Sequence, residues 1–199
     1  MKYLLPISYL APIEYYAFLL QKENIFIESK EHFVKQSIRN RCNIYGSNGM
    51  QTISIPKKRK SSSKTLISDI YISKNHNWQK EHYNAIESAY NSSPFFQYYK
   101  DGLKKFYNKK QENLFDFNFG LTKKILEFLQ LEKEIKITSK YVRGVEGCDL
   151  RDYDFISSEI KEYSQVFEEK HGFIPNLSIL DLLCNIGPES TEYLEKLSI

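Results

Sequence analysis

A strand, a helix and a second strand follow one another near the N-terminus, and this pattern constrains the fold most. The apolar run over residues 3–8 predicts a short buried strand, and Pro12 stands where the first turn of a following helix would begin. Residues 24–28 predict the second strand. Strands joined by one helix form a right-handed βαβ unit in which the two strands are parallel. The sequence therefore predicts an α/β protein.

The carboxyl ends of parallel strands lie at one edge of a sheet, and open α/β sheets bind ligands there. Tyr9 follows the first predicted strand, and the loop after the second runs to Gln36. We interpret Tyr9, Lys35 and Gln36 as substrate-binding residues at this edge. The chain has 15 Tyr and 13 Phe; tyrosines can line sugar or peptide sites, although core packing is the alternative.

The middle of the chain predicts a β-hairpin. Apolar and polar residues alternate from Ile38 to Tyr45, and an Asn-Gly turn signal precedes residues 51–55, where the alternation resumes. A further β-rich segment is expected over residues 66–73. The run over residues 57–64 is strongly basic and is expected to form a solvated loop, with attraction to an anionic substrate or membrane surface as the alternative.

The C-terminal half is predicted to be helix-rich, because apolar residues recur there at spacings of three and four. Asn77 is the expected N-cap of the first helix. Residues 135–138 predict a strand, and residues 143–149 predict a loop. No long linker interrupts the pattern, so we expect a single mixed domain over residues 1–199. The predicted helices cover residues 78–90, 96–108, 112–131, 154–169, 178–185 and 191–197.

Charge and cysteine content exclude several classes of protein. The 28 basic and 25 acidic residues give a formal net charge of +3, too balanced for a protein that coats nucleic acid. The three cysteines are widely spaced and match no metal-binding pattern, so we expect reduced thiols, no metal site and a cytoplasmic location. Pro6, Pro12 and Glu14 interrupt the N-terminal apolar stretch, so no signal sequence or membrane span is expected.

Histidines supply the first candidate catalytic group. His32 follows the second predicted strand, so its imidazole is expected over the ligand edge, where it can accept a proton from an attacking amine or hydroxyl. The alternative is a loop histidine that bonds a neighbouring carbonyl group. His82 shares a helical stripe with Trp78, which indicates a core histidine or a wall of a pocket, and His76 indicates a solvated turn.

Two arginines supply the candidate anion-binding group. Arg39 and Arg41 occupy alternate positions of the predicted hairpin strand, so they share one face and stand roughly 7 Å apart along it. Paired guanidinium groups can bind a pyrophosphate or a carboxylate, whereas salt bridges to acidic side chains are the alternative. Cys42 lies on the opposite, apolar face and is expected to be a core thiol, as is Cys184.

A polar loop before a short C-terminal helix supplies the remaining candidates. Residues 171–176 combine an imidazole, an aromatic ring, a proline and an amide, which suits a rigid loop against a ligand. We interpret His171 as catalytic and Asn176 as substrate-binding. Ser178 and Asp181 have the spacing of a capping box, in which Asp181 would reach back to a free backbone amide. The free amides of that helix start could also bind an anion.

Several short motifs are spread along nearly the whole chain, and their combination is specific although each alone is weak. They resemble the WbqC-like family of bacterial proteins, which is linked to the synthesis of O-antigen and other surface polysaccharides. The motifs are residues 4–15, His32 with Lys35-Gln36, Arg39-Asn40-Arg41, Trp78-Gln79 with His82, Ser92-Ser93-Pro94-Phe95-Phe96, Asp116-Phe117-Asn118, Gln165-Val166-Phe167 and residues 171–176.

The resemblance implies a role in making or decorating a surface-glycan building block. As an enzyme, the protein would transfer an acyl or aminoacyl group from an activated donor to a nucleotide-linked amino sugar. Arg39 and Arg41 would hold the diphosphate, and His32 or His171 would take the proton from the amine. The sequence offers no clear nucleophile, which favours direct transfer. The alternative is a non-catalytic protein of the same pathway that binds a glycan precursor or a partner enzyme.

Several common catalytic motifs are absent from the sequence. The chain has no Gly-x-Gly-x-x-Gly, Walker, Gly-x-Ser-x-Gly or His-Glu-x-x-His motif, so dinucleotide enzymes, nucleotide hydrolases, α/β-hydrolases and zincins lose their usual support. We expect Tyr9, His32, Arg39 and Arg41 to face one cleft. The loop over residues 171–176 is expected to fold over that cleft and to bring its histidine toward His32. The sugar, the transferred group, the donor and the oligomeric state stay open.

Overall fold

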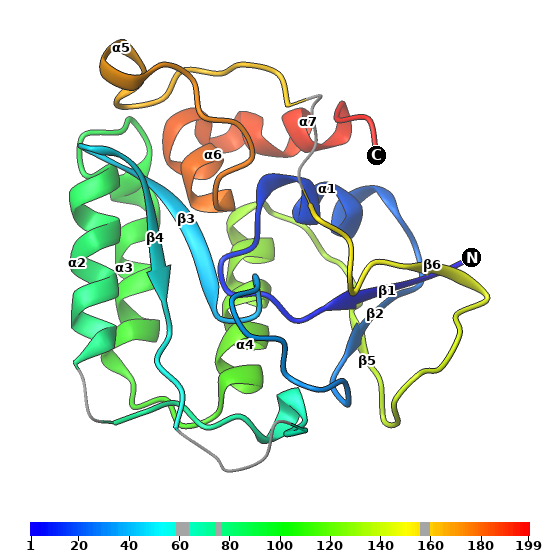
Figure 1. Ribbon diagram of the computed structural model, residues 1–199. Coiled ribbons are helices and arrows are strands. Elements are labelled where there is room, and N and C mark those ends of the chain that lie inside the picture. The colour runs from blue at the N-terminus through cyan, green and yellow to red at the C-terminus, as the bar shows by residue number, and fades with distance from the viewer. Residues whose placement is uncertain (59–63, 75–76, 156–159) are drawn as a thin grey trace.

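A four-stranded parallel sheet forms one part of the molecule (Figure 1). The computed structural model describes residues 1–58, 64–74, 77–155 and 160–199. The strands follow the order β5-β2-β1-β6, and every adjacent pair is parallel. Their carboxyl ends therefore point to one edge, and the predicted α/β fold class is confirmed. The strands are β1 (Lys2–Pro6), β2 (Ile25–Glu28), β5 (Lys136–Ile137) and β6 (Gly147–Asp149).

The predicted βαβ unit is present at the N-terminus. Helix α1 (Ile13–Gln21) joins β1 to β2, and Tyr3 of β1 lies opposite Ile25 of β2. α1 begins directly after Pro12, as the sequence indicates. Seven of its nine residues are buried, so this helix lies inside the core and does not present a broad polar face to water.

The predicted hairpin is also confirmed. β3 (Arg41–Gly46) pairs antiparallel with β4 (Gly49–Ser54), and Ser47 and Asn48 form the turn between them. Gly49 has a φ of +97°, a backbone conformation that residues with a Cβ atom rarely adopt. The first strand begins at Arg41, three residues later than predicted. Arg39 therefore lies in the preceding turn and does not share a strand face with Arg41.

The C-terminal half is rich in helices, as predicted. In Figure 1, α2 and α3 stand side by side next to the hairpin, and α6 and α7 lie close to α1. One hydrophobic core includes residues of both the sheet and the helices. In the described ranges, no helix is both long and apolar enough to cross a bilayer. The helices are α2 (Trp78–Tyr90), α3 (Phe96–Asn108), α4 (Leu114–Phe128), α5 (Glu168–His171), α6 (Ile179–Ile186) and α7 (Ser190–Glu195), with 3₁₀ helices η1 (Ile67–Asp69) and η2 (Gly187–Glu189).

Three secondary-structure predictions were wrong. Residues 66–73 form η1 flanked by isolated bridges, not a β-rich segment. The described part of residues 154–167 is not helical, and only α5 follows it. β6 lies within the predicted loop, because a Cβ atom at Gly147 would come within 2.1 Å of the Lys2 carbonyl oxygen and only glycine allows this approach. His76 and most of the basic run over residues 57–64 lie outside the described residues.

Candidate functional site

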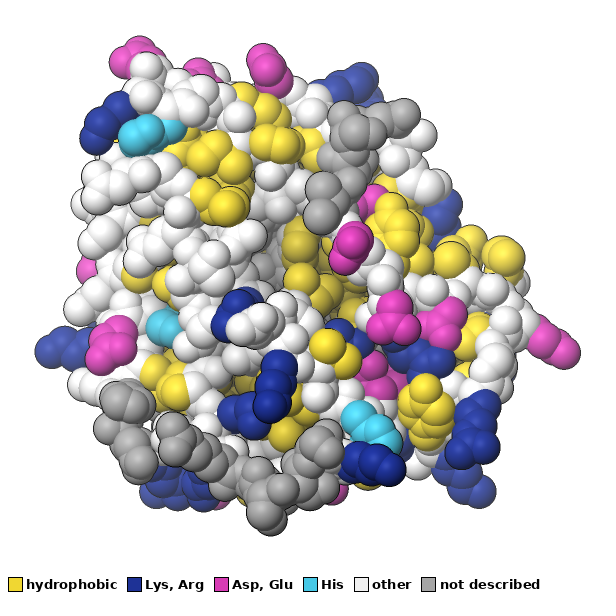
Figure 2. Space-filling view, viewed as in Figure 1, with side chains coloured by type: hydrophobic (Ala, Val, Ile, Leu, Met, Phe, Trp, Pro, Cys, Tyr) yellow, Lys and Arg dark blue, Asp and Glu magenta, His cyan; other side chains and the backbone are white. Residues whose placement is uncertain are grey.

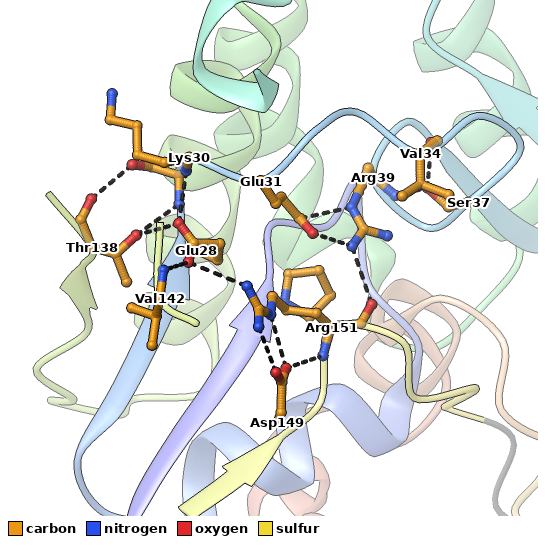
Figure 3. A network of polar contacts seen from close by, with 12 residues as sticks. Glu28, Lys30, Glu31, Val34, Ser37, Arg39, Thr138, Val142, Asp149 and Arg151 are labelled. Atoms are coloured by element: carbon orange, nitrogen blue, oxygen red, sulfur yellow. Dashed lines mark hydrogen bonds and ion pairs between the residues drawn. The ribbon is translucent and has the colours of Figure 1, made fainter. Parts of the chain in front are cut away.

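A buried carboxylate organises the carboxyl edge of the sheet (Figure 3). Glu28 ends β2 and is fully buried. Its Oε1 accepts hydrogen bonds from the Thr138 hydroxyl at 2.6 Å and the Lys30 amide at 2.7 Å. Its Oε2 accepts from the Val142 amide at 3.0 Å. One side chain therefore connects the end of β2 to the segment that follows β5.

Arg151, two residues after the end of β6, extends this network. Its Nε and Nη2 donate to the Asp149 carboxylate at 2.9 and 2.6 Å, and its Nη1 lies 3.5 Å from Glu28 Oε2. The guanidinium carbon also stands 4.8 Å from the centre of the Tyr141 ring. These contacts fix the Arg151 side chain, which is mostly buried.

Arg39 and Glu31 form a second buried pair beside the first. Arg39 donates from Nε and Nη2 to the two Glu31 oxygens at 2.7 and 2.6 Å, and Nη2 also reaches the Arg151 carbonyl oxygen at 3.1 Å. Burial raises the pKa of Glu31, and the hydrogen bonds from Arg39 oppose that shift. The salt-bridge alternative is thus correct for Arg39. Only its Nη1 makes no hydrogen bond within the described chain.

Two adjoining pockets lie over this network, and we call them the paired pockets. The larger has a volume of about 540 Å³ and the smaller about 240 Å³. Arg39, Arg151, Asp152, Tyr153 and Asp154 line the larger pocket. Figure 2 shows this face hollowed near its middle, with acidic and basic side chains around the hollow. The walls common to both pockets are Pro12, Gln36, Ser37, Ile38, Asn43 and Asn176.

Charged side chains of both signs, with no partner among the described residues, line the paired pockets. Arg41 lines the smaller pocket, and the described chain provides its side chain with no hydrogen bond and no ion pair. Asp152 and Asp154 line only the larger pocket, and their carboxylates are likewise unpaired among the described residues. A ligand that carries a negative group and an amino group could meet both kinds of charge.

Four of the predicted site residues come together at the paired pockets. These residues are Gln36, Arg39, Arg41 and Asn176. Asn176 has a φ of +51°, which asparagine tolerates better than most residues. Its Oδ1 accepts from the Glu14 amide at 3.1 Å, and its Nδ2 donates to the Phe155 carbonyl oxygen. Asn176 therefore forms a fixed wall, and two of the four hydrogen bonds that its side chain can make are already used.

Tyr9 does not reach the pockets, so its placement in a shared cleft was wrong. Its ring is fully buried, and its hydroxyl lies 2.6 Å from the Tyr107 hydroxyl and 2.9 Å from His82 Nδ1. Leu10, which follows it, has a φ of +43° and lines the smaller pocket instead. His82 is only 6% exposed, which confirms its interpretation as a core histidine, and this burial lowers its pKa to about 4.

The structure does not assemble the predicted two-histidine site. His171 lies at the end of α5, where its Nε2 stands 2.9 Å from the Ser47 carbonyl oxygen at the hairpin turn. His32 forms an isolated bridge with Leu66, after the carboxyl end of β2. α5 and the loop after β2 lie at opposite ends of the molecule in Figure 1. Neither histidine lines the paired pockets, nor does the exposed Lys35.

Sequence reasoning missed the acidic wall of the larger pocket. Residues 143–149 were interpreted as a loop, so the charged residues after them were not connected to a strand end. The available signal was a cluster of charged residues within six positions, namely Asp149, Arg151, Asp152 and Asp154. A strand followed by charged residues belongs at the ligand edge of a parallel sheet.

Asp181 has a different role from the predicted capping box. Ser178 does cap α6, since its Oγ accepts from the Leu180 amide at 3.3 Å. The Asp181 carboxylate instead accepts through Oδ2 from the Tyr163 hydroxyl at 2.6 Å and from Gln165 Nε2 at 2.7 Å. Burial raises the pKa of Asp181 to about 6, against the effect of these hydrogen bonds. Its side chain holds the segment before α5 against α6.

The predicted core thiols are confirmed. Cys42 and Cys184 are buried, and burial raises the pKa of both thiols. Cys42 lines the smaller pocket, yet a raised pKa disfavours the reactive thiolate.

Comparison with known protein families matches residues 8–152 and 146–193 to the WbqC-like protein family. This chain belongs to that family. The two matched ranges include β2, the hairpin and every residue that the paired pockets share, so the network and pockets described above lie within the WbqC-like part of the chain.

A relative of this WbqC-like protein occurs in Mycobacterium tuberculosis. The uncharacterized protein Rv1507c is 26% identical over 214 residues, which cover 90% of this chain and 91% of the relative. No solved structure matches the chain. The family assignment therefore rests on the match over residues 8–152 and 146–193. The reaction of this protein has to be inferred from the residues of the site.

Proposed function

We propose that this WbqC-like protein acts on an anionic precursor of a bacterial surface glycan, bound in the paired pockets. The observation that carries the proposal is Arg41, a guanidinium group that lines a pocket without any partner in the described chain. Arg39, by contrast, is neutralised by the Glu31 carboxylate. A planar guanidinium with free donors suits a phosphate or diphosphate.

The pocket chemistry supports a nucleotide-linked amino sugar as the substrate. Arg41 and the free Nη1 of Arg39 would bind the diphosphate. Asp152 and Asp154 would face the amino group, and the Tyr153 ring, held by a 2.7 Å bond from its hydroxyl to Glu14, offers a flat surface for a sugar. The larger pocket has a volume of about 540 Å³, within the range of roughly 300–1,000 Å³ typical of small-molecule sites.

The reaction we propose is transfer of an acyl or aminoacyl group to that amine. The amine nitrogen bonds to the carbonyl carbon of a thioester or aminoacyl ester, and the bond from this carbon to sulfur or oxygen breaks. Asp152 or Asp154 takes the proton that the nitrogen loses and returns it to the departing thiolate or alkoxide. These carboxylates replace the two histidines, which lie outside the pockets. Direct transfer fits the protonated state that burial imposes on Cys42.

A non-catalytic role in the same pathway is the second candidate. Its support is the stabilised wall of the site, where Arg39, Arg151 and Asn176 already bond to protein groups. Such a preformed wall also suits recognition without chemistry. The distinction depends on whether the free carboxylates are needed after the ligand has bound.

A turnover assay separates the two roles. The purified protein is incubated with a nucleotide-linked amino sugar and an acyl-thioester or aminoacyl donor, and the N-acylated product is followed by mass spectrometry. We expect product with the wild type and loss of about 100-fold or more in kcat for the double variant Asp152→Asn/Asp154→Asn, because general-base catalysis contributes about 10²–10⁴-fold. If the wild type binds the nucleotide-linked sugar but forms no product, the non-catalytic role is favoured.

Replacing Arg41 by alanine should weaken binding of the nucleotide-linked sugar about 10- to 100-fold, because charge-assisted hydrogen bonds contribute about 1.5–3 kcal/mol. Isothermal titration calorimetry measures this loss. Arg143→Ala is the matched control, because Arg143 is exposed and lines neither of the paired pockets. If both variants bind as tightly as the wild type, Arg41 is not the anion anchor.

A further inference from the structure

A separate pocket lies on one face of the parallel sheet, and we call it the sheet-face pocket. Its volume is about 290 Å³, and it shares no lining residue with the paired pockets. Strands β1, β2 and β5 and residues 138–145 provide its walls, and no helical residue lines it. Leu4 and Phe26 are register partners on β1 and β2, so their side chains project from the same face of the sheet.

The walls of the sheet-face pocket combine apolar side chains with cations. Leu4, Phe26, Val142 and Val145 are among the apolar residues that line it, and no Asp or Glu does so. Lys2 and Lys140 also line it, and the described chain gives neither ammonium group an ion pair. Lys2 Nζ stands 5.4 Å from the centre of the Phe26 ring. Lys136 Nζ lies 5.9 Å from the same ring, but it also pairs with Glu134 at 4.0 Å. An anionic group at this rim would therefore meet positive charge without competition from a lining carboxylate.

The pocket is preformed, because the network at the carboxyl edge fixes one of its walls. The Thr138 hydroxyl and the Val142 amide both donate to Glu28. Tyr141 packs against the Arg151 guanidinium at 4.8 Å. A wall held in this way loses little conformational freedom when a ligand binds.

We propose that the sheet-face pocket binds a small amphipathic anion, namely an aliphatic carboxylate of medium chain length. The chain lies between Leu4, Phe26 and Val145, and the carboxylate lies between the ammonium groups of Lys2 and Lys140. A sugar fits this pocket poorly, because the Thr138 hydroxyl is already used by Glu28 and few groups remain for several hydroxyls. The pocket volume lies near the lower limit of about 300 Å³ for small-molecule sites, which suits one short chain. This assignment does not depend on the function proposed for the paired pockets.

The test is an NMR titration of the isotope-labelled full chain with octanoate. Octan-1-ol supplies the same chain without charge, and acetate supplies the same head group without the chain. We expect saturable shift changes concentrated over residues 137–145 and 2–4, and weaker binding of both reference compounds. Lys2→Glu and Lys140→Glu should each weaken octanoate binding about two- to fivefold, because both side chains are exposed and exposed ion pairs contribute at most about 1 kcal/mol. Val145→Asp should weaken it by at least as much.

Lys80→Glu is the matched control, because it makes the same change of charge at an exposed position on α2, a helix that provides no residue to this pocket and stands apart from the sheet in Figure 1. Its affinity for octanoate should equal that of the wild type. The assignment is overturned if octan-1-ol binds as tightly as octanoate, or if the shift changes lie elsewhere. Equal weakening by Lys80→Glu, or no binding at millimolar octanoate, would overturn it as well. The effect of Arg41→Ala on nucleotide-sugar binding tests the paired pockets alone and leaves this assignment unaffected.

Discussion

Replacing Glu31 by alanine is expected to lower the free energy of unfolding by about 3–5 kcal/mol, because it leaves the Arg39 guanidinium buried without its counter-charge. The side chains of Arg39 and Glu31 are only 4% and 8% exposed, and two short hydrogen bonds connect them. Water cannot replace the lost partner at such a position without opening the structure. Urea unfolding followed by circular dichroism measures the change.

Two further variants make this first prediction specific. Glu23→Ala removes a carboxylate that pairs with Lys133 while 84% exposed, and it should cost at most about 1 kcal/mol. The double variant Glu31→Leu/Arg39→Met should recover much of the loss, since apolar side chains can replace a buried ion pair. A loss for Glu31→Ala no larger than that for Glu23→Ala would show that the buried pair contributes little to stability.

Asp181→Asn should stabilise the protein at pH 8 by about 3 kcal/mol and have little effect near pH 4. The pKa of Asp181 is raised from its ordinary value of 3.8 to about 6 by burial, so the folded state holds the proton more tightly than the unfolded chain. Its favourable contribution is therefore fully present below pH 3.8 and is lost as the pH rises through about 6. Asparagine keeps the shape and an acceptor for Tyr163 and Gln165, but it never becomes charged.

Measuring unfolding free energies of the wild type and this variant from pH 4 to pH 8 tests the second prediction. The gap between the two curves should open mainly between pH 4 and pH 7. Asp101→Asn is the control, because it removes an exposed carboxylate on α3 and should leave the pH dependence as in the wild type. A gap that is constant across the pH range would mean that Asp181 does not titrate as its burial implies.

Local patterns in the sequence were enough to predict the N-terminal βαβ unit and the hairpin. Each depends on residues close together in the chain, such as Pro12 before α1 and the turn before Gly49. β6 was missed because nothing in its own three residues favours a strand. It forms through pairing with β1, where Lys2 lies opposite Gly147 across a long sequence separation.

The candidate site was only partly predictable, for the same reason. Gln36 was found because it ends the loop after a predicted strand, Arg41 because it lies on the predicted hairpin strand, and Asn176 because it lies in the polar loop before a predicted helix. The structure brings all three to the paired pockets. Arg39 was assigned to a strand face, but the strand begins two residues later and Glu31 captures the side chain. His171 was expected near His32, yet α5 is held to the hairpin turn at Ser47. Contacts between distant segments decided each of these outcomes, and periodicity carries no information about them.

Helix α1 is covered by α7, which is synthesised much later than α1. The Gln21 side chain donates through Nε2 to the carbonyl oxygens of Leu194 and Leu197, both at 2.7 Å, and Leu194 lies 173 residues further along the chain. Ribosomes add about 5–20 residues per second, so α1 leaves the ribosome roughly 10–35 s before its cover exists. A helix that buries seven of its nine residues in the folded protein is uncovered for that interval. We therefore expect the nascent chain to depend on chaperones that shield α1, and this part of the core to form only after α7 has left the ribosome.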